Sequence, residues 1–501
     1  METLPIVYQS LQHLDRIAVV DEAGTYTYAE LLERSARTAN CLLEKALDLK
    51  EARVAFLIPP SMDHVAVQWG IWRAGGIAVP LCMQHPAREL EYTIDDSAAS
   101  VVISHPEFED LLRPIAEARG LRFLVSPVPE VEAMGSEPVL PRVNASRRAM
   151  LLYTSGTTNR PKGAVTTHTI IASQIQSLVQ AWQWTPDDHI LHVLPLHHLH
   201  GVLNAMCCAL WSGATCEFLP KFNEDRVWER IVAGKGLTLF MAVPTIYQRL
   251  TRAWDRADSA RQRNMTDGCR RLRLMVSGSA ALPVPTLEKW REVSGHTLLE
   301  RYGMTEIGMG LSNPLHGKRR PGCVGTPLPG VEVRLVDEEN AAVPDGQAGQ
   351  IQVRGSTVFL EYWRKTDATA EAFTTDGWFK TGDVAERKAG VYRILGRDSV
   401  DIIKTGGYKV SALEIEDVLR THSDIEECAV VGVEDQEWGQ RVAAVVVLQS
   451  GCEIDLDSLR YWCKQLLAPY KVPSLLRITE ALPRNAMGKI MKPELTKQFE
   501  T

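Results

Sequence analysis

Apolar and polar positions follow two periods along this chain, and their order predicts the fold. Short apolar runs such as RVAFLIPP (53–60) and LTLFMAV (237–243) have the length and residue types of buried strands. Helical patterns such as SMDHVAVQWGIWRAG (61–75) lie between these runs. Repeated strand–helix–strand units indicate largely parallel sheets with helices on their faces.

The pattern changes near residue 330. The segments 331–339, 349–356 and 390–397 read as antiparallel strands joined by turns rich in Gly and Asp. A compact α/β pattern then resumes, with a helix predicted to begin after Ser411, whose partner in a capping box is Glu414. We therefore expect an α/β protein. The pattern places a boundary at 397–401. Before it lies a large N-terminal domain (1–396) with stacked, mostly parallel sheets, helices and a small antiparallel β subdomain, and after it a small C-terminal α/β domain (402–501).

Composition excludes several classes of protein. The 501 residues are too many for one hydrophobic core, and the net charge of −7 gives no support for nucleic-acid binding. No apolar run reaches the ~20 residues of a membrane span. Ten scattered cysteines without a C-x-x-C pair indicate reduced thiols. The N-terminal residues resemble neither a secretory signal nor a transit peptide.

The stretch YTSGTTNRPKG (153–163) has the composition of a loop that binds phosphate. Its glycines let backbone N–H groups turn toward a ligand, its hydroxyl side chains add donors, and Lys162 adds positive charge. It is not a P-loop, because Gly163 and Ala164 follow the lysine where Ser or Thr would be required. We predict an anion site of another kind, with a solvated polar turn as the alternative.

This stretch resembles the signature loop of the adenylate-forming superfamily, which contains acyl-CoA synthetases, luciferases and the adenylation domains of peptide synthetases. Five further motifs resemble that superfamily and occur in its order: SGSAAL (277–282), YGMTE (302–306), FKTGD (379–383), GRDSVDIIKTGGYKV (396–410) and PRNAMGKI (483–490). Asn159 departs from the pattern, which has glycine there. Asn is the least costly non-glycine residue where φ must be positive.

The resemblance implies that a carboxylic acid attacks the α-phosphate of ATP, with Mg²⁺ bound, and that the thiol of CoA then takes the acyl group. It assigns the catalytic roles to Lys489, Thr305 and Glu306, and Glu306 also to the metal. The nucleotide and CoA contacts that it implies are Thr154, Ser155, Gly156, Thr157, Thr158, Asn159, Arg160, Pro161, Lys162, Gly278, Ser279, Ala280, Glu300, Tyr302, Gly303, Met304, Asp383, Arg397, Gly407 and Tyr408. The resemblance also implies that residues 397–401 are a hinge and that the C-terminal domain is mobile. In the family, rotation at this hinge withdraws the lysine and brings the Gly406–Tyr408 segment toward the thiol.

The acyl pocket is predicted to be polar. The segment LPLHHLHGVLN (194–204) matches the stretch that lines this pocket in the family, and it carries three histidines. Arg301 precedes the nucleotide-stacking Tyr302, and a buried arginine needs an anion. Either Glu300 neutralises Arg301, or the substrate brings a second carboxylate, which arginine binds with two hydrogen bonds.

The wording of these motifs resembles malonyl-CoA and methylmalonyl-CoA synthetases of the mitochondrial animal type. That resemblance implies malonate or methylmalonate as substrate and a mitochondrial matrix location, with the cytoplasm as alternative. For the oligomeric state, which the sequence does not fix, we take a monomer as the default. We predict that the distal carboxylate is bound by Arg301, helped by His198, His200 and Ser312. The alternatives are a synthetase for short or medium monocarboxylic acids and a non-catalytic nucleotide sensor.

Overall fold

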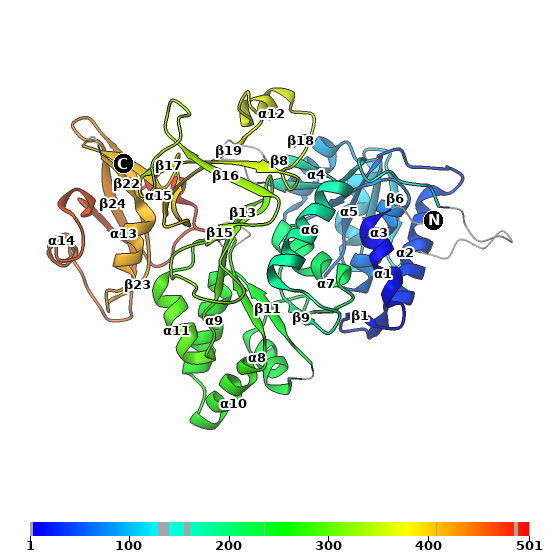
Figure 1. Ribbon diagram of the computed structural model, residues 1–501, viewed down its shortest axis with the longest axis horizontal. Helices are drawn as coiled ribbons and strands as arrows, with labels where there is room; N and C mark the ends of the chain where they lie inside the picture. The colour runs from blue at the N-terminus through cyan, green and yellow to red at the C-terminus, as the bar shows by residue number, and fades with distance from the viewer. Residues whose placement is uncertain are drawn as a thin grey trace.

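The computed structural model describes residues 4–128, 140–154, 161–234, 236–406, 408–484 and 489–499. Figure 1 shows two large sheets with helices around them, a smaller sheet above, and the C-terminal residues gathered at one side. The helices are α1 (Pro5–Ser10), α2 (Tyr28–Leu43), α3 (Met62–Arg73), α4 (Ala87–Ser97), α5 (Glu109–Glu117), α6 (His168–Trp182), a π-helix (His200–Cys207), α7 (Cys208–Trp211), α8 (Glu224–Ala233), α9 (Pro244–Asp255), α10 (Ser259–Arg270), α11 (Val284–Ser294), α12 (Thr366–Ala372), α13 (Ala412–Leu419), α14 (Leu456–Cys463) and α15 (Lys492–Lys497).

The first large sheet has nine strands and a parallel centre. The strands in spatial order are β15 (Thr326–Pro327), β14 (Gly308–Ser312), β13 (Leu299–Met304), β12 (Leu274–Ser277), β11 (Leu239–Ala242), β9 (His189–His192), β10 (Thr215–Phe218), β1 (Ile17–Val20) and β2 (Thr25–Thr27). At one edge β14 runs antiparallel to β13, in a register that pairs Arg301 with Ser312. Two predicted substrate residues therefore lie side by side on neighbouring strands.

The second large sheet has seven strands. They are β18 (Glu361–Tyr362), β8 (Lys162–Thr167), β7 (Arg148–Thr154), β4 (Ile77–Pro80), β3 (Arg53–Leu57), β5 (Val101–Ser104) and β6 (Arg122–Val125). Strand β3 is covered on both faces, since Val54 and Phe56 belong to the central core and Ala55 and Leu57 to the outer one. This double burial explains why β3 reads as a continuous apolar run.

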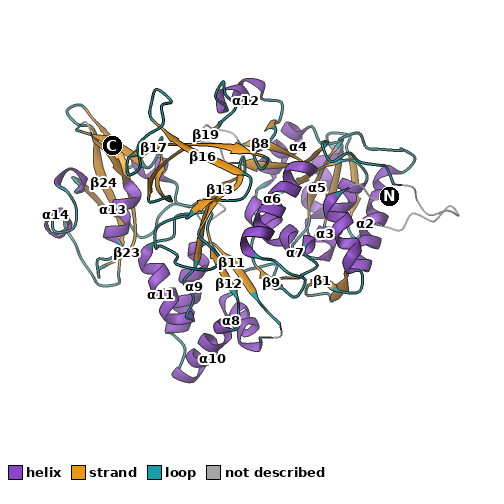
Figure 2. Cartoon of the chain, viewed as in Figure 1, coloured by secondary structure: helices purple, strands orange, loops and turns teal. Residues whose placement is uncertain are grey.

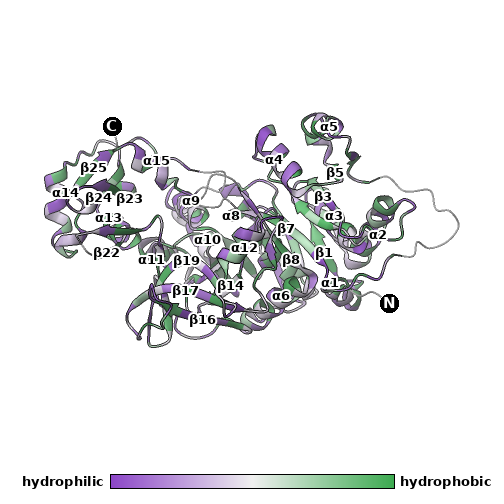
Figure 3. Ribbon diagram, turned by 90° about the horizontal axis from the view of Figure 1, so that it is seen from above, coloured by the Kyte–Doolittle hydropathy of each residue, from purple (hydrophilic) through white to green (hydrophobic). Residues whose placement is uncertain are grey.

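Five layers result from these contacts. Helices α3, α6, α7 and the π-helix pack between the two large sheets in one common core. Helices α4 and α5 cover the outer face of the seven-stranded sheet, and α8 to α11 cover the outer face of the nine-stranded sheet. Figure 2 shows this alternation of strands and helices, and Figure 3 shows apolar residues concentrated on strands such as β3. The prediction of stacked, mostly parallel sheets with helices is confirmed.

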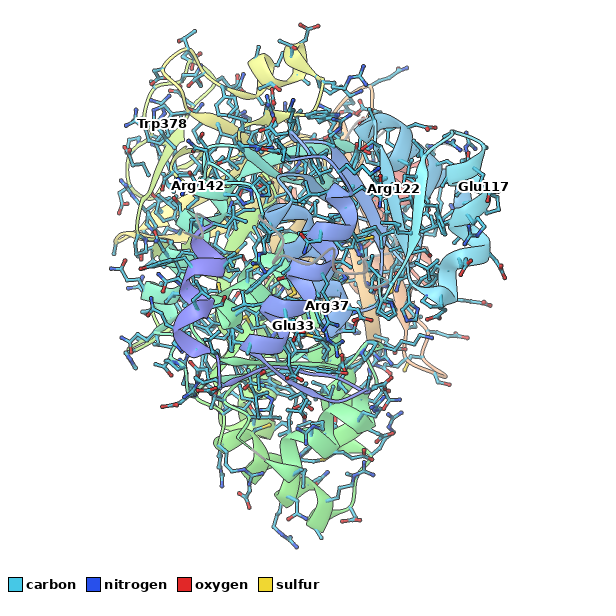
Figure 4. All side chains as sticks on the ribbon, turned by 90° about the vertical axis from the view of Figure 1, so that its right-hand side faces the viewer. Glu33, Arg37, Glu117, Arg122, Arg142 and Trp378 are labelled. Atoms are coloured by element: carbon cyan, nitrogen blue, oxygen red, sulfur yellow. The ribbon has the colours of Figure 1, made fainter. Side chains whose placement is uncertain are left out.

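The helix surfaces that face solvent carry charged pairs. Figure 4 shows the labelled Glu33 and Arg37 near each other on α2, where they form an ion pair four residues apart. The helix begins with a capping box in which the Thr27 side chain accepts from the Glu30 N–H and the Glu30 carboxylate accepts from the Thr27 N–H. Among the described residues, no helix combines the length and the apolar character that crossing a bilayer requires. All ten cysteines are free thiols, as predicted.

Two smaller sheets follow. The predicted antiparallel segments form β16 (Val331–Val336), β17 (Ala348–Gly355) and β20 (Val391–Arg397), together with β19 (Phe379–Lys388), which contains the FKTGD motif. The C-terminal sheet has β22 (Tyr408–Ser411), β21 (Ile402–Thr405), β24 (Gly439–Leu448), β23 (Ile425–Asp435) and β25 (Leu475–Ile478). Ser411 caps α13 by accepting a hydrogen bond from the Glu414 N–H, which confirms the predicted helix start.

Candidate functional site

The centre of the site is the guanidinium of Arg301 on β13. The residue is 5% exposed, and its Nε and Nη2 atoms have no hydrogen-bond partner in the described part of the chain. Burial lowers the pKa of Arg301 to about 9. Leaving a buried charged donor unpaired is expensive. The arrangement therefore calls for an anionic ligand.

Glu300 does not neutralise this guanidinium. Neighbouring residues on a strand project to opposite faces, and Glu300 accepts a hydrogen bond from the Gly322 N–H at 3.1 Å. No ion pair joins Glu300 and Arg301 in the described structure. Desolvation and the charge of Asp417 raise the pKa of Glu300, to about 8, against the opposing effect of the Gly322 hydrogen bond. Of the two explanations of Arg301, the structure favours a second carboxylate on the substrate.

We expect Glu300→Gln to change how stability depends on pH. The folded protein holds the Glu300 proton with a pKa of about 8, against an ordinary value of 4.5, so the parent loses stability as pH rises between these values. The glutamine variant lacks this loss and should be more stable than the parent at pH 8.5, by an amount of the order of a few kcal/mol. Urea unfolding at pH 5 and pH 8.5 measures this, and an equal difference at both pH values would contradict it.

The segment after β12 lies against Arg301. A Cβ atom on Gly278 would come within 2.4 Å of the Arg301 Cζ atom, so a larger residue there would displace the guanidinium. Ser279 has a φ of 69°, and its Oγ lies 3.2 Å from Nδ1 of His200. Ser279 was predicted as a nucleotide contact, and its position beside His200 places it at the acyl pocket as well. Ala280, the next residue, is exposed.

The histidine stretch leads into a π-helix that begins at His200, which the sequence did not predict. Single turns of this kind are rare and occur mostly at functional sites. Asn204 is fully buried on this helix, and both polar atoms of its side chain lack a described partner. The Nε2 atoms of His198 and His200 are also buried without a partner. Several hydrogen-bonding groups are thus available to a polar ligand.

These histidines supply neutral hydrogen-bonding groups. Desolvation, then the charges of Lys489 and His85, lower the pKa of His198 to about 4. Desolvation, then the charge of Arg301, place the pKa of His200 well below its ordinary value. At neutral pH the buried positive charge beside these neutral histidines is therefore that of Arg301.

Three residues predicted to contact the nucleotide form a hydrogen-bonded group. The Tyr302 hydroxyl donates to Oδ2 of Asp383 at 2.6 Å, and Arg397 Nε donates to Oδ1 at 3.1 Å. Asp383 and Arg397 are opposite each other in the antiparallel pair of strands β19 and β20. A carboxylate has enough lone pairs to accept these bonds and ribose hydroxyls together.

Glu306 and Lys162 meet through a residue that the sequence analysis missed. The Tyr362 hydroxyl donates to Oε1 of Glu306 at 2.9 Å, and Lys162 Nζ lies 5.0 Å from the centre of the Tyr362 ring. Glu306 is 4% exposed, and burial raises its pKa. A single carboxylate near Lys162, a residue of the predicted phosphate loop, fits Mg²⁺, which binds one or two protein carboxylates together with substrate phosphates. Thr305 precedes Glu306 and is partly buried.

The phosphate loop connects β7 to β8. Thr154 and Lys162 are opposite each other in that antiparallel pair, and Pro161 O accepts a hydrogen bond from Tyr92. Gly303 and Met304 end β13, at a bulge where a Cβ on Gly303 would lie 2.2 Å from Gly308 O. The remaining predicted loop residues and the hairpin glycine lie outside the described residues: Ser155, Gly156, Thr157, Thr158, Asn159, Arg160 and Gly407.

Lys489 lies at the same site although it belongs to the C-terminal segment. Desolvation and the charges of Arg397 and Arg301 lower its pKa, and Asp383 opposes them. The residue keeps an exposed surface. The domains are therefore arranged with the lysine beside the predicted nucleotide and acyl contacts.

Two other predicted residues have protein partners. Ser312 accepts from Trp182 Nε1 at 3.0 Å and donates its proton to Asn313 O at 2.8 Å, so it has no further proton to offer a carboxylate. We therefore propose that Ser312 supports β14 and does not bind the substrate. Tyr408 stacks on Tyr470 with ring centres 4.3 Å apart, and it is 53% exposed.

Known proteins resemble this chain over nearly its whole length. Mitochondrial malonate–CoA ligase of Bos taurus is 48% identical and covers 99% of the chain and 90% of its own length. Malonate–CoA ligase of Arabidopsis thaliana is 40% identical, with 97% and 86% covered. ATP-bound MatB of Rhodopseudomonas palustris is 35% identical and superposes with a TM-score of 0.90 over 99% of both chains, against 0.81 for its apo form.

Family models match both parts of the chain. Residues 7–363 match the AMP-binding enzyme family, and residues 414–489 match the AMP-binding enzyme C-terminal domain. The first match alone spans more than half of the 501 residues. The residues that the two matches contain include the phosphate loop, Arg301 and Lys489. The chain therefore belongs to the family of AMP-binding enzymes.

Proposed function

We propose that this enzyme is an ATP-dependent malonate–CoA ligase. It transfers AMP from ATP to one carboxylate of malonate, releasing pyrophosphate, and then passes the malonyl group to the thiol of CoA, releasing AMP. Methylmalonate is a second substrate in this proposal. The observation that carries it is the buried Arg301 guanidinium, which has two unpartnered nitrogens beside the nucleotide contacts. Malonate–CoA ligases at 40–48% identity support it.

Arg301 binds the distal carboxylate of malonate in this proposal. A guanidinium holds a carboxylate with two parallel hydrogen bonds, which fixes the orientation of the acid as well as its charge. Nδ1 of His200 lies 3.2 Å from the Ser279 Oγ atom, and its Nε2 atom has no described partner. In this proposal Nε2 donates a hydrogen bond to the same carboxylate. His198 and Asn204 complete the polar wall of the pocket. The reacting carboxylate then points toward Lys489.

The nucleotide is held by the group around Asp383. This carboxylate accepts hydrogen bonds from the ribose hydroxyls, Tyr302 stacks on the adenine, and Thr305 contacts the α-phosphate. Glu306, together with the phosphates, binds Mg²⁺, which neutralises the negative charge that otherwise repels the attacking carboxylate. The low-dielectric surroundings of Glu306, whose partner is the Tyr362 hydroxyl, favour a cation there.

The second half-reaction uses another domain arrangement. The turn at Arg397–Asp401 connects β20 to β21 and is the proposed hinge. Rotation there removes Lys489 and brings the hairpin with Gly406, Gly407 and Tyr408 toward the acyl group. Tyr408 is exposed and is the first residue of β22, opposite Thr405 of β21. Such a movement can present it to CoA.

A pyrophosphate-exchange assay tests the proposed function. With the purified chain, ATP and Mg²⁺, we expect exchange to depend on malonate, with methylmalonate next and butyrate or octanoate giving at least about 100-fold lower kcat/KM, because they leave Arg301 unpaired. Addition of CoA should then release AMP. Equal exchange with monocarboxylic acids would indicate the monocarboxylate synthetase instead, and nucleotide binding without exchange would indicate the sensor.

The compartment and the oligomeric state are further parts of the proposal. Mitochondrial malonate–CoA ligases from cow, mouse and human are 48–49% identical to this chain, which supports a mitochondrial matrix location. A monomer is consistent with a site built from one chain, since Arg301, Asp383 and Lys489 all come from the same polypeptide.

A further inference from the structure

A buried ion cluster lies directly behind the segment that carries Lys489. Lys492, the first residue of α15, is 8% exposed and binds two carboxylates, Asp401 Oδ1 at 2.5 Å and Glu416 Oε1 at 2.7 Å. Glu416 on α13 also binds Arg420 at 3.0 Å and accepts from the Val430 N–H at 2.9 Å. Desolvation lowers the pKa of Lys492, but the two carboxylates outweigh it, so the lysine is charged.

Asp401 connects this cluster to the proposed hinge. Its Oδ2 atom accepts a hydrogen bond from the Arg397 N–H at 3.0 Å, and its own N–H donates to Arg397 O at 2.7 Å. The turn is tight, because a Cβ on Gly396 would lie 2.3 Å from the Asp401 Cβ. One carboxylate therefore holds the start of the turn through one oxygen and Lys492 through the other.

Lys489 precedes Lys492 by three residues, so the anchor restricts where its side chain can lie. Consecutive Cα atoms are about 3.8 Å apart, which limits the separation of the two Cα atoms to roughly 11 Å. Two backbone contacts hold the two ends of this segment together. Arg484 and Ile490 form an antiparallel β-bridge, and the Met491 N–H donates to Pro483 O at 2.8 Å. Lys492 is the point at which this segment is bound to the hinge turn.

We propose that Lys492 is a positioning residue for the adenylation half-reaction. Its ion pair with Asp401 binds the segment carrying Lys489 to the C-terminal end of the hinge turn. Rotation then takes place within residues 397–400, and Asp401, Lys492 and Lys489 move as one body. The accuracy with which Lys489 returns to the nucleotide depends on this pair. The inference rests on the proposed function, in which Lys489 acts on the acid and the α-phosphate.

Half-reaction kinetics of the full chain test the proposal. In Lys492→Met we expect kcat for malonate-dependent pyrophosphate exchange to fall about 100-fold, because a displacement of about 1 Å can cost that much. The KM values for ATP and malonate should change little. Malonyl-CoA formation from supplied malonyl-adenylate, which does not use Lys489, should stay near the parent rate. Lys492→Arg should restore exchange, because arginine can bind the same two carboxylates.

A second variant covers the case in which Lys492→Met fails to fold. Asp401→Asn keeps an oxygen for the Arg397 N–H and leaves Lys492 paired with Glu416, but it removes the charge that binds Lys492 to the hinge. We expect the same selective loss of exchange. The matched control is Arg273→Met, which breaks the partly buried pair with Asp188, located just before strands β12 and β9 of the nine-stranded sheet. It should lower the unfolding temperature and change both half-reactions equally or not at all.

Equal loss of both half-reactions in Asp401→Asn, or no rescue by arginine, would overturn the proposal and leave Lys492 a purely structural role. Failure of the proposed function looks different, because the parent protein itself would then show no malonate-dependent exchange.

Discussion

Replacing Arg301 with methionine is expected to lower kcat/KM for malonate by about 10²- to 10³-fold while leaving butyrate turnover unchanged or higher. The guanidinium is 5% exposed, and no described carboxylate pairs with it. Methionine keeps much of the volume but offers no donor, so the distal carboxylate of malonate would be buried without a partner. Truncating one side of a buried charge pair costs about 2–5 kcal/mol. Butyrate has no second carboxylate, so its turnover does not depend on the guanidinium.

A partly buried arginine, Arg319, provides the control for this experiment. The guanidinium of Arg319 donates to carbonyl oxygens of the protein, including Leu315 O at 2.9 Å, and burial lowers its pKa as it does for Arg301. Arg319→Met should therefore reduce stability and leave the ratio of malonate to butyrate kcat/KM at the parent value. Initial rates of AMP release with both acids measure that ratio. Equal losses on the two acids in Arg301→Met would contradict the carboxylate-binding role.

Replacing Lys489 with methionine should separate the two half-reactions. The side chain lies among Arg397, Arg301 and Asp383, and two of these charges and desolvation lower its pKa. In the adenylation step a cation there bridges the attacking carboxylate and the α-phosphate, both of which are negative. Loss of one such preorganised donor costs roughly 10²- to 10³-fold in kcat. Pyrophosphate exchange should fall by that amount.

The thioester half-reaction is the internal control for Lys489. Malonyl-CoA formation from supplied malonyl-adenylate should remain near the parent rate, because the lysine has left the site by then in the proposed rotation. Lys497→Met, on the exposed side of α15, should leave both half-reactions unchanged. If Lys489→Met slowed both half-reactions equally, the assignment of the lysine to adenylation would be wrong.

The Arg301 and Lys492 observations concern different steps of the same reaction. In the proposed function Arg301 selects the acid, since two of its nitrogens have no described partner and are available to a carboxylate. Lys492 affects how accurately Lys489 is placed beside that acid, since it binds Asp401 of the proposed hinge. A variant at Arg301 should change the ratio of kcat/KM between malonate and butyrate. A variant at Lys492 should change the ratio between the rates of adenylation and thioester formation.

The sequence by itself determined the order of strands and helices, the parallel centre and the start of α13, because local periods and caps depend on neighbouring residues. It also determined the candidate chemistry, because the motifs occur as short continuous runs. Tertiary structure alone decided what surrounds each side chain. It turned Glu300 away from Arg301, placed the Tyr362 hydroxyl on Glu306, and used the Ser312 proton within the protein. These outcomes depend on contacts between segments far apart in the chain, which hydrophobic periodicity does not record.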